Sequence, residues 1–331
     1  MNKIVVVGSL NLDMVIEVER IPVVGETILG YNIKKTPGGK GANQSYAAGK
    51  LGASVTILGA IGDDDIGVIL KENLQLVGVC TDYLKVTEKE SSGLAIVAVD
   101  EEGDNSIIVI QGANKTVDRE YIDLHMEIIK ESDIVICQLE IPLDTVLYVA
   151  KKAKEYGKIF ILDPAPAQKE LPEELLCCVD ILKPNETELE IMTGLEAKTE
   201  NLKKATDYLK SKGVGNVLVT LGKDGTYLND ENNNIQLYNS YKVNSVDTTA
   251  AGDAYMAALA FSLSKGENLS SSIRYASIVS SIVVSRKGAQ SSIPSREEVE
   301  EYQKKLSNQV TNDLGMESKA RSMRNEVMLT K

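Results

Sequence analysis

Ile4-Val5-Val6-Val7-Gly8 is the stretch that decides the fold, because an unbroken apolar run of this length is typical of a strand buried on both faces. Similar runs recur at residues 54–59, 133–139, 158–163, 180–183 and 216–221. Segments with a helical period lie between them, at residues 64–77, 142–156, 186–193 and 202–212. Strands that alternate with helices form parallel βαβ units. We therefore predict an α/β fold with a doubly wound, mostly parallel central sheet flanked by helices.

Two pairs of segments depart from this alternation. Residues 14–20 and 27–35 alternate apolar and polar side chains, as do residues 94–99 and 106–110, and Asp100-Glu101-Glu102-Gly103-Asp104-Asn105 joins the second pair in a typical hairpin. We predict that they form a small antiparallel β lid, at about residues 13–38 and 93–112, on a domain of residues 1–306. The polar tail 307–331 is expected to be disordered or to form a poorly docked helix.

Composition narrows the classes of function. The net charge of −12 argues against nucleic acid or an anionic membrane surface as a partner. The apolar runs are shorter than the ~18 residues that a membrane-spanning helix requires. Cys80, Cys137, Cys177 and Cys178 lack metal-ligand or redox spacing, so we expect reduced thiols in a cytoplasmic protein. His125 is the single histidine, which excludes histidine-based catalysis.

Asp247-Thr248-Thr249-Ala250-Ala251-Gly252-Asp253 is the clearest functional signal. Small residues stand where a strand is expected to give way to the helix 251–265, so a ligand can approach the backbone. N–H groups at a helix start bind anions, and the helix dipole strengthens that binding. A carboxylate beside such a cradle can take a proton from a hydroxyl group. The pattern predicts a kinase for a small alcohol, although an aspartate near a helix start is also an ordinary feature.

Polar residues beyond the strand ends supply candidate ligands for the alcohol. Gly38-Gly39-Lys40-Gly41-Ala42-Asn43-Gln44 precedes a helix expected at 43–51 and is neither a dinucleotide fingerprint nor a Walker loop. Asn11, Asp13 and Glu140 follow apolar strands, and ligands of open α/β sheets bind at those strand ends. A plain turn remains the alternative interpretation of the block 38–44 and of Asn11 and Asp13.

Two later motifs suit a nucleotide. Lys183-Pro184-Asn185-Glu186-Thr187-Glu188 ends a strand and begins a helix, where Asn185 and Glu188 either cap the helix or hold the water shell of Mg²⁺. Thr220-Leu221-Gly222-Lys223-Asp224-Gly225 is a plain turn or a site of nucleotide contacts.

Taken in order, these motifs resemble those of the PfkB (ribokinase) family of carbohydrate kinases over roughly residues 3–305. The block 38–44 is similar to the family's first signature, 247–253 to its second, and Asn185–Glu188 to its NxxE motif. The similarity extends to residues 8–13, 22–27, 162–167 and 286–290.

The resemblance implies ATP-dependent phosphorylation of D-ribose at its 5-hydroxyl, with Mg²⁺, with K⁺ as activator, and in a homodimer joined through the lid. Each implied role is assigned to residues of this chain. Asp253 would be the base and Ala250, Ala251 and Gly252 the anion hole; ribose would be bound by Asn11, Asp13, Gly39, Lys40, Asn43, Glu140 and Asp253. The nucleotide would be bound by Asn185, Glu188, Thr220, Gly222, Gly225, Gly252 and Ser277, and K⁺ by Asp247, Thr249, Val283, Arg286, Gly288 and Ser292.

Two departures and two alternatives accompany the resemblance. Ser277 stands where many relatives carry histidine, and the tail extends past the usual family end. The first alternative is a kinase of the same fold for fructose, deoxyribose or a nucleoside, although two Phe and no Trp offer little for a base. The second is a sugar sensor without catalysis, which would not need Asp253, the NxxE pair and the anion hole together.

Overall fold

The predicted α/β architecture is confirmed by the computed structural model, which describes residues 3–306. Eight strands form the central sheet in the order β14-β13-β12-β11-β10-β9-β1-β4. Six run parallel and match the six predicted apolar runs: β1 (Lys3–Val7), β4 (Ser54–Leu58), β9 (Ile134–Cys137), β10 (Ile159–Leu162), β11 (Ile181–Leu182) and β12 (Asn216–Thr220). The antiparallel strands β13 (Thr226–Asn229) and β14 (Ile235–Tyr238) extend one edge.

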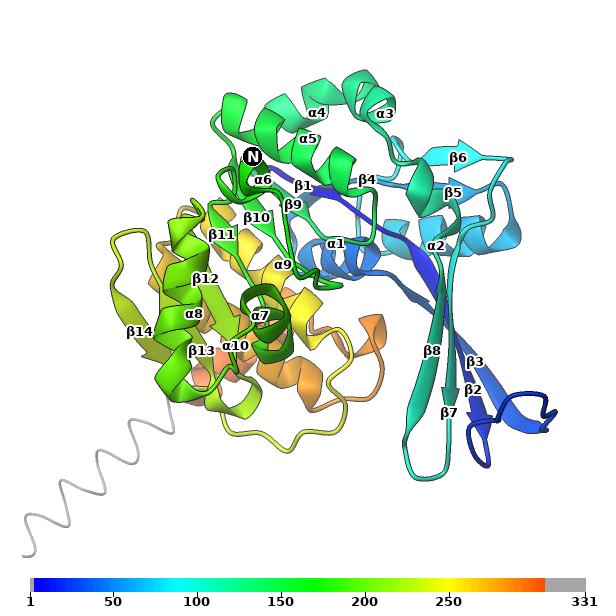
Figure 1. Ribbon diagram of the computed structural model, residues 1–331. Helices are drawn as coiled ribbons and strands as arrows, with labels where there is room; N and C mark the ends of the chain where they lie inside the picture. Colours follow the sequence, from blue (N-terminus) through cyan, green and yellow to red (C-terminus); the bar gives the residue numbers. More distant parts are fainter. Residues whose placement is uncertain (1–2, 307–331) are drawn as a thin grey trace, which may run out of the picture.

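Helices cover both faces of this sheet (Figure 1), because residues of one strand point alternately into two apolar cores. Ile4 and Val6 of β1 enter one core, whereas Val5 and Val7 enter the other. The first core is closed by α1 (Lys40–Lys50), α2 (Asp65–Gln75), α9 (Ala251–Ser264) and α10 (Leu269–Val284). The second is closed by α3 (Arg119–Leu124), α4 (Met126–Lys130), α5 (Leu143–Glu155), α6 (Glu173–Leu176), α7 (Glu186–Thr193) and α8 (Thr199–Ser211).

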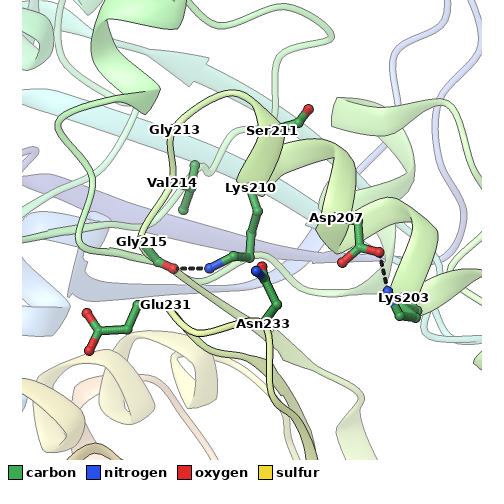
Figure 2. Close-up of a pocket in the computed structure, with 9 residues that line it drawn as sticks. All are labelled: Lys203, Asp207, Lys210, Ser211, Gly213, Val214, Gly215, Glu231 and Asn233. Carbon is green, nitrogen blue, oxygen red and sulfur yellow. Dashed lines mark hydrogen bonds and ion pairs between the residues drawn. The ribbon is translucent and has the colours of Figure 1, made fainter.

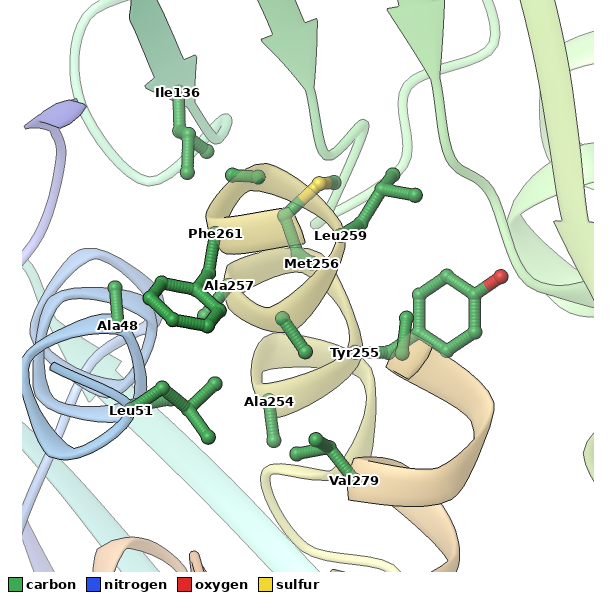
Figure 3. Packing of buried hydrophobic residues seen from close by; sticks show 14 of the residues in the cluster. Ala48, Leu51, Ile136, Ala254, Tyr255, Met256, Ala257, Leu259, Phe261 and Val279 are labelled. Atoms are coloured by element: carbon green, nitrogen blue, oxygen red, sulfur yellow. The ribbon is translucent and has the colours of Figure 1, made fainter. Parts of the chain in front are cut away.

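Helix α9 is buried on nearly every side (Figure 3). Its alanines, among them Ala254 and Ala257, let α1 and α10 approach its backbone closely, while Phe261 fills the space toward Ala48. Tight packing of this kind leaves a helix little freedom to shift. Asp253 at its start is therefore held by a rigid element.

The lid is a separate four-stranded sheet that projects from the main body (Figure 1). It consists of β2 (Asn11–Val18), β3 (Gly30–Gly38), β7 (Gly93–Val99) and β8 (Asn105–Ile110), in the order β3-β2-β7-β8. The two predicted antiparallel pairs are confirmed. The two inner strands, β2 and β7, run parallel to one another, a detail that the sequence did not reveal. A two-stranded parallel sheet of β5 (Ala60–Gly62) and β6 (Lys85–Thr87) also escaped prediction.

Two local predictions need correction. Helix α1 begins at Lys40 rather than at Asn43, because Gly39 takes a left-handed conformation, φ +84°, and the Glu140 carboxylate accepts the Lys40 N–H. No strand leads into residues 247–253, since β14 ends at Tyr238 and the N–H groups of Val246 and Asp247 bind the carbonyl of Val284 instead. The single histidine, His125, lies where α3 ends and α4 begins.

Four helices are followed closely by a glycine with positive φ, at Gly52, Gly78, Gly157 and Gly213. Within residues 3–306, no helix has the length and apolar character needed to span a membrane. The predicted tail, 307–331, lies outside the described residues.

Candidate active site

The candidate site lies at the carboxyl ends of the parallel strands. Asn11 and Asp13 follow β1, Glu140 follows β9, Asp163 follows β10, and Lys183 follows β11. Parallel strands bring these ends to one edge of the sheet. Helices α1 and α9 begin at the same edge and join through side chains of their first turns. The fold thus gathers polar groups that lie far apart in the sequence.

Asp253 is the centre of this cluster. Its carboxylate is buried, and its two oxygens accept hydrogen bonds from Asn43 Nδ2 at 2.9 Å and from Gln44 Nε2 at 3.0 Å. Burial raises the pKa of Asp253, whereas the nearby ammonium of Lys40 opposes that rise. The carboxylate is therefore fixed in direction and more basic than an exposed aspartate, which suits proton removal from a hydroxyl.

The first turn of α9 supplies the anion cradle. Ala250 is the N-cap in a left-handed conformation, φ 60° and ψ 7°, which is rare for alanine. Ala251 N–H already donates to the Thr248 carbonyl at 3.2 Å. The N–H groups of Gly252 and Asp253 have no acceptor within the helix, as in any first turn. Gly252 N–H, which the resemblance assigns to the anion hole together with Ala250 and Ala251, is therefore available to an anion, and so is Asp253 N–H.

Asp13 and Glu140 form the acidic side of the site. Burial raises the pKa of Asp13 to about 6, and the charges of Glu140 and Asp253 add to the rise. A Cβ on Gly38 would lie 2.2 Å from Asp13 Oδ2, so glycine is needed for this close approach. Glu140 Oε2 accepts the Lys40 N–H at 3.0 Å and also contacts Ser9 Oγ.

Asn11 lies beside this acidic group, at the start of β2. Its Oδ1 accepts a hydrogen bond of 2.8 Å from Asn114 Nδ2, and Asn114 Oδ1 in turn accepts the Leu10 N–H at 2.9 Å. Asn11 and Asp13 stand on β2 of the lid, and the carboxylates of Glu140 and Asp253 lie close enough to Asp13 to raise its pKa. A polyhydroxylated ligand would find acceptors here for several hydroxyl groups.

The Lys40 side chain interacts electrostatically with Asp253 at the centre of the site as well as with Glu140 on its acidic side. Burial favours the neutral amine, but the carboxylates of Asp163, Asp253, Glu140 and Glu188 outweigh it and raise its pKa. Its ammonium is therefore charged and lies within electrostatic range of both the acidic side and the NxxE motif.

The NxxE motif forms a reciprocal capping box at the start of α7. Asn185 Oδ1 accepts the Glu188 N–H at 2.8 Å, and Glu188 Oε2 accepts the Asn185 N–H at 2.8 Å. The backbone of Asn185 also pairs with Thr220 at the end of β12. Gly222 and Gly225, both with positive φ, shape the turn that follows, and Ser277 is half-buried on α10. Capping uses one Glu188 oxygen, so Oε1 stays available to a hydrated Mg²⁺.

Asp247 joins two loops behind the cradle. Its Oδ1 accepts from Thr249 N at 2.9 Å and Thr249 Oγ1 at 2.6 Å, and its Oδ2 accepts from Gly288 N at 2.8 Å. Partial burial opposes ionisation, but these hydrogen bonds outweigh it and lower the pKa of Asp247. The predicted cation ligands of loop 283–292 thus lie beside the cradle loop, although Val283 O already accepts the Arg286 N–H and Ser292 Oγ donates to the Ala289 carbonyl.

Several functional-looking residues received no role from the sequence. Gln44, which lies in the glycine-rich block, donates to both Asp163 and Asp253, and Gln138 Nε2 donates to Gln44 Oε1 at 2.6 Å. Gln290 Nε2 donates to Asn43 Oδ1 at 3.0 Å and so ties the cation loop to the base. Asp163 and Lys183 could have been found by the rule that pointed to Glu140, because both follow parallel strands.

A cavity of about 700 Å³ lies elsewhere, beside the end of α8 and the start of β12 (Figure 2). Lys210 lies in it and donates to the carbonyls of Gly215 and Asp230. Since this is the amino end of β12, the cavity opens at the edge of the sheet opposite the cluster around Asp253.

Comparisons with known proteins agree with this geometry. Residues 1–296 match the family described as pfkB family carbohydrate kinase. The ribokinase of Staphylococcus aureus is 40% identical over 301 residues, 90% of this chain and 98% of that protein. The deoxyribokinase of Salmonella typhi is 36% identical over 90% of this chain and 98% of its own length. The structure of Arabidopsis thaliana ribokinase complexed with ribose and ATP superposes with a TM-score of 0.87, at 37% identity, over 91% of this chain and 99% of that one.

Proposed function

This chain belongs to the PfkB family of carbohydrate kinases, and we propose that it transfers the terminal phosphoryl group of ATP to the 5-hydroxyl of D-ribose. The observation that carries the proposal is the placement of Asp253. Its carboxylate, held by Asn43 and Gln44, lies at the mouth of a helix start whose free N–H groups can hold a phosphoryl group. The ribokinases of several organisms are similar to this chain over nearly their whole length.

The reaction follows from that placement. The Asp253 carboxylate accepts the proton of the ribose 5-hydroxyl while the hydroxyl oxygen, O5, forms a bond to the γ-phosphorus of ATP. The bond from phosphorus to the β,γ-bridging oxygen breaks, and its electron pair leaves with ADP. Asn11, Asp13 and Glu140 accept hydrogen bonds from the remaining hydroxyls, which fixes O5 in line with the leaving oxygen. The cradle N–H groups bind the transferred oxygens where negative charge develops.

Two ions are part of the proposal. Mg²⁺ would neutralise charge on the nucleotide phosphates, held through water by Glu188, whose Oε1 the capping box leaves free. K⁺ would lie by the carbonyls of Thr249, Arg286 and Gly288, near the Asp247 carboxylate. A shell of mostly carbonyl oxygens suits a large ion of single charge.

The lid carries a further proposal, a homodimer. Strand β8 exposes Ile107, Ile108, Val109 and Ile110, and β3 exposes Tyr31 and Ile33. An apolar edge strand left open in this way is prone to pair with another chain. We propose that the lid of a second copy covers it, and that the dimer works in the cytoplasm, where ATP is available.

Substrate identity is tested by ADP release, coupled to a reporter, against D-ribose, 2-deoxy-D-ribose, D-fructose and adenosine. The expected result is the highest kcat/KM for D-ribose. The matched rival is 2-deoxy-D-ribose, because a deoxyribokinase is nearly as similar to this chain as the ribokinases are. A higher kcat/KM for 2-deoxy-D-ribose would reassign the substrate, and ribose binding without ADP release would favour a sugar sensor.

A further inference from the structure

Lys183 is a buried ammonium whose partner does not satisfy it. The side chain follows β11 and is 4% exposed, and that of Asp163 is 1% exposed. Lys183 Nζ lies 3.6 Å from Asp163 Oδ2, which is beyond hydrogen-bonding distance. The two groups therefore form an ion pair without a hydrogen bond between them. Its charge also acts on the Asp253 carboxylate, where it opposes the rise in pKa that burial causes. A buried ammonium is costly to the fold unless acceptors satisfy its N–H donors.

Lys183 lies next to the anion cradle. A Cβ on Gly252 would lie only 3.2 Å from Lys183 Nζ, so the ammonium rests against the first turn of α9. Gly252 is also one of the two residues whose N–H groups are free at that turn. An anion held by these N–H groups is therefore within reach of the ammonium.

Asp163 is held in place independently of Lys183. Its Oδ2 accepts a hydrogen bond of 3.0 Å from Gln44 Nε2, the same nitrogen that donates to Asp253 Oδ1. Asp163 Oδ1 is buried and has no hydrogen-bond partner among the described residues. Asp163 is thus fixed by Gln44, and Lys183 can turn its N–H donors toward an anion without breaking a hydrogen bond to Asp163.

We propose that Lys183 is a catalytic residue that donates hydrogen bonds to the γ-phosphoryl oxygens of ATP. The proposal rests on the kinase function proposed above. Lys183 keeps its proton throughout: as the bond to ribose O5 forms and the bond to the bridging oxygen breaks, its positive charge offsets the charge on the transferred oxygens. Asp163 holds the ammonium in the free enzyme, and the absent side chain at Gly252 leaves room for the approach.

A purely structural role is the competing interpretation. The pair could simply tie the ends of β10 and β11 together. The two roles differ in what they predict for nucleotides, because only a phosphoryl contact distinguishes a triphosphate from a diphosphate.

The test uses Lys183→Met, which keeps the length of the side chain and removes its charge. Titration calorimetry without sugar compares adenylyl imidodiphosphate with ADP. We expect the triphosphate analogue to lose at least about 30-fold in affinity, while ADP changes less than about threefold, in line with a charge-assisted contact. The kcat for ribose should fall by about 10²–10³-fold, with ribose affinity unchanged.

Lys210→Met is the matched control, since Lys210 is a partly buried lysine at the opposite edge of the sheet (Figure 2). It should leave both nucleotide affinities unchanged. Lys183→Arg keeps the charge and should retain part of the preference for the triphosphate, which also serves if Lys183→Met does not fold. Equal losses for both nucleotides, or no loss, would overturn the proposal. A wrong sugar assignment would instead appear in the wild-type substrate panel, because the affinity ratio is measured without sugar.

Discussion

At the scale of single residues, the ionised Asp13 side chain lowers the stability of the fold but favours the binding of hydroxyl groups. Its pKa of about 6 in the fold lies above the ordinary 3.8, so the folded state holds the proton more tightly than the unfolded chain does. The resulting stabilisation is complete below pH 3.8 and disappears as the pH rises through 6. At neutral pH the ionised Asp13 consequently destabilises the fold. The same carboxylate accepts hydrogen bonds from hydroxyl groups, which gives it a use in substrate binding.

We therefore predict that Asp13→Asn raises the free energy of unfolding at pH 8 by about 1–3 kcal/mol, since roughly two pKa units correspond to about 3 kcal/mol before solvent screening. The gain should shrink toward pH 4. Urea denaturation at pH 4, 6 and 8 measures it, and calorimetry should show weaker ribose binding. A gain that does not depend on pH would refute the assigned cause.

Ala250 stores strain at the cradle. We predict that Ala250→Gly stabilises the protein by about 1 kcal/mol, because glycine adopts positive φ without steric cost. The kcat should fall severalfold, since the turn becomes less ordered. Asn233, with φ 63° in the distant β13–β14 loop, is the matched control. Asn233→Gly should change stability slightly and kcat not at all; equal kcat losses in both variants would argue against a role for the strained turn.

Individual site residues were predictable only where a local pattern marked them. Asp253 and Asn43 stand in glycine-rich segments, and the structure brings them to 2.9 Å. Gln138 and Gln290 stand in segments without such a pattern, and their importance depends on distant partners: Gln44 lies 94 positions from Gln138, and Asn43 lies 247 positions from Gln290. The NxxE motif shows that a local pattern can also be ambiguous. Its residues Asn185 and Glu188 form a complete helix cap, so the pattern alone does not distinguish a cap from a nucleotide site.

At the scale of elements, the apolar strands of the central sheet were predicted better than the pairing of the lid strands or the start of helix α1. An apolar run such as that of β1 is a local property, whereas the parallel pairing of β2 with β7 joins segments about 80 residues apart and depends on tertiary packing. The start of α1 was misplaced because a glutamate 100 positions away accepts the Lys40 N–H. Contacts of this kind leave no periodic trace in the sequence.

Asp247 joins the loop that carries Thr249 to the loop that carries Gly288, and we predict that a cation beside these two loops supports catalysis. Replacing K⁺ with tetramethylammonium should lower kcat, because the cradle loop and loop 286–292 would lose the cation that we place between them. Asp247→Ala should lower kcat in K⁺ and abolish the difference between the two cations. Asp230, which accepts N–H groups in the β13–β14 turn, provides the control: Asp230→Ala should keep the full response. Indifference of the wild-type enzyme to the cation would refute the site.

At the scale of the whole molecule, the exposed lid is the feature that a single chain does not explain. Ile108 is 61% exposed on β8. We predict that Ile108→Glu converts a dimer into a monomer, because the charge would be buried against the partner's lid. Light scattering after gel filtration should give twice the chain mass of 35.9 kDa for the wild type and that mass for the variant. Leu76→Glu, on an apolar residue that is 83% exposed at the end of α2, should remain dimeric; a monomeric wild type would contradict the proposal.

The sheet edge, the anion cradle and the base Asp253 act together in one reaction, and identification of its product tests this most directly. The protein is incubated with ATP, Mg²⁺ and D-ribose labelled with ¹³C at position 5, and the product is examined by NMR. Wild-type protein should give a C5 signal split by phosphorus. Asp253→Asn should bind ribose with similar affinity but turn over about 10²–10⁴-fold more slowly. Phosphate on another carbon, or near-normal turnover by Asp253→Asn, would contradict the account.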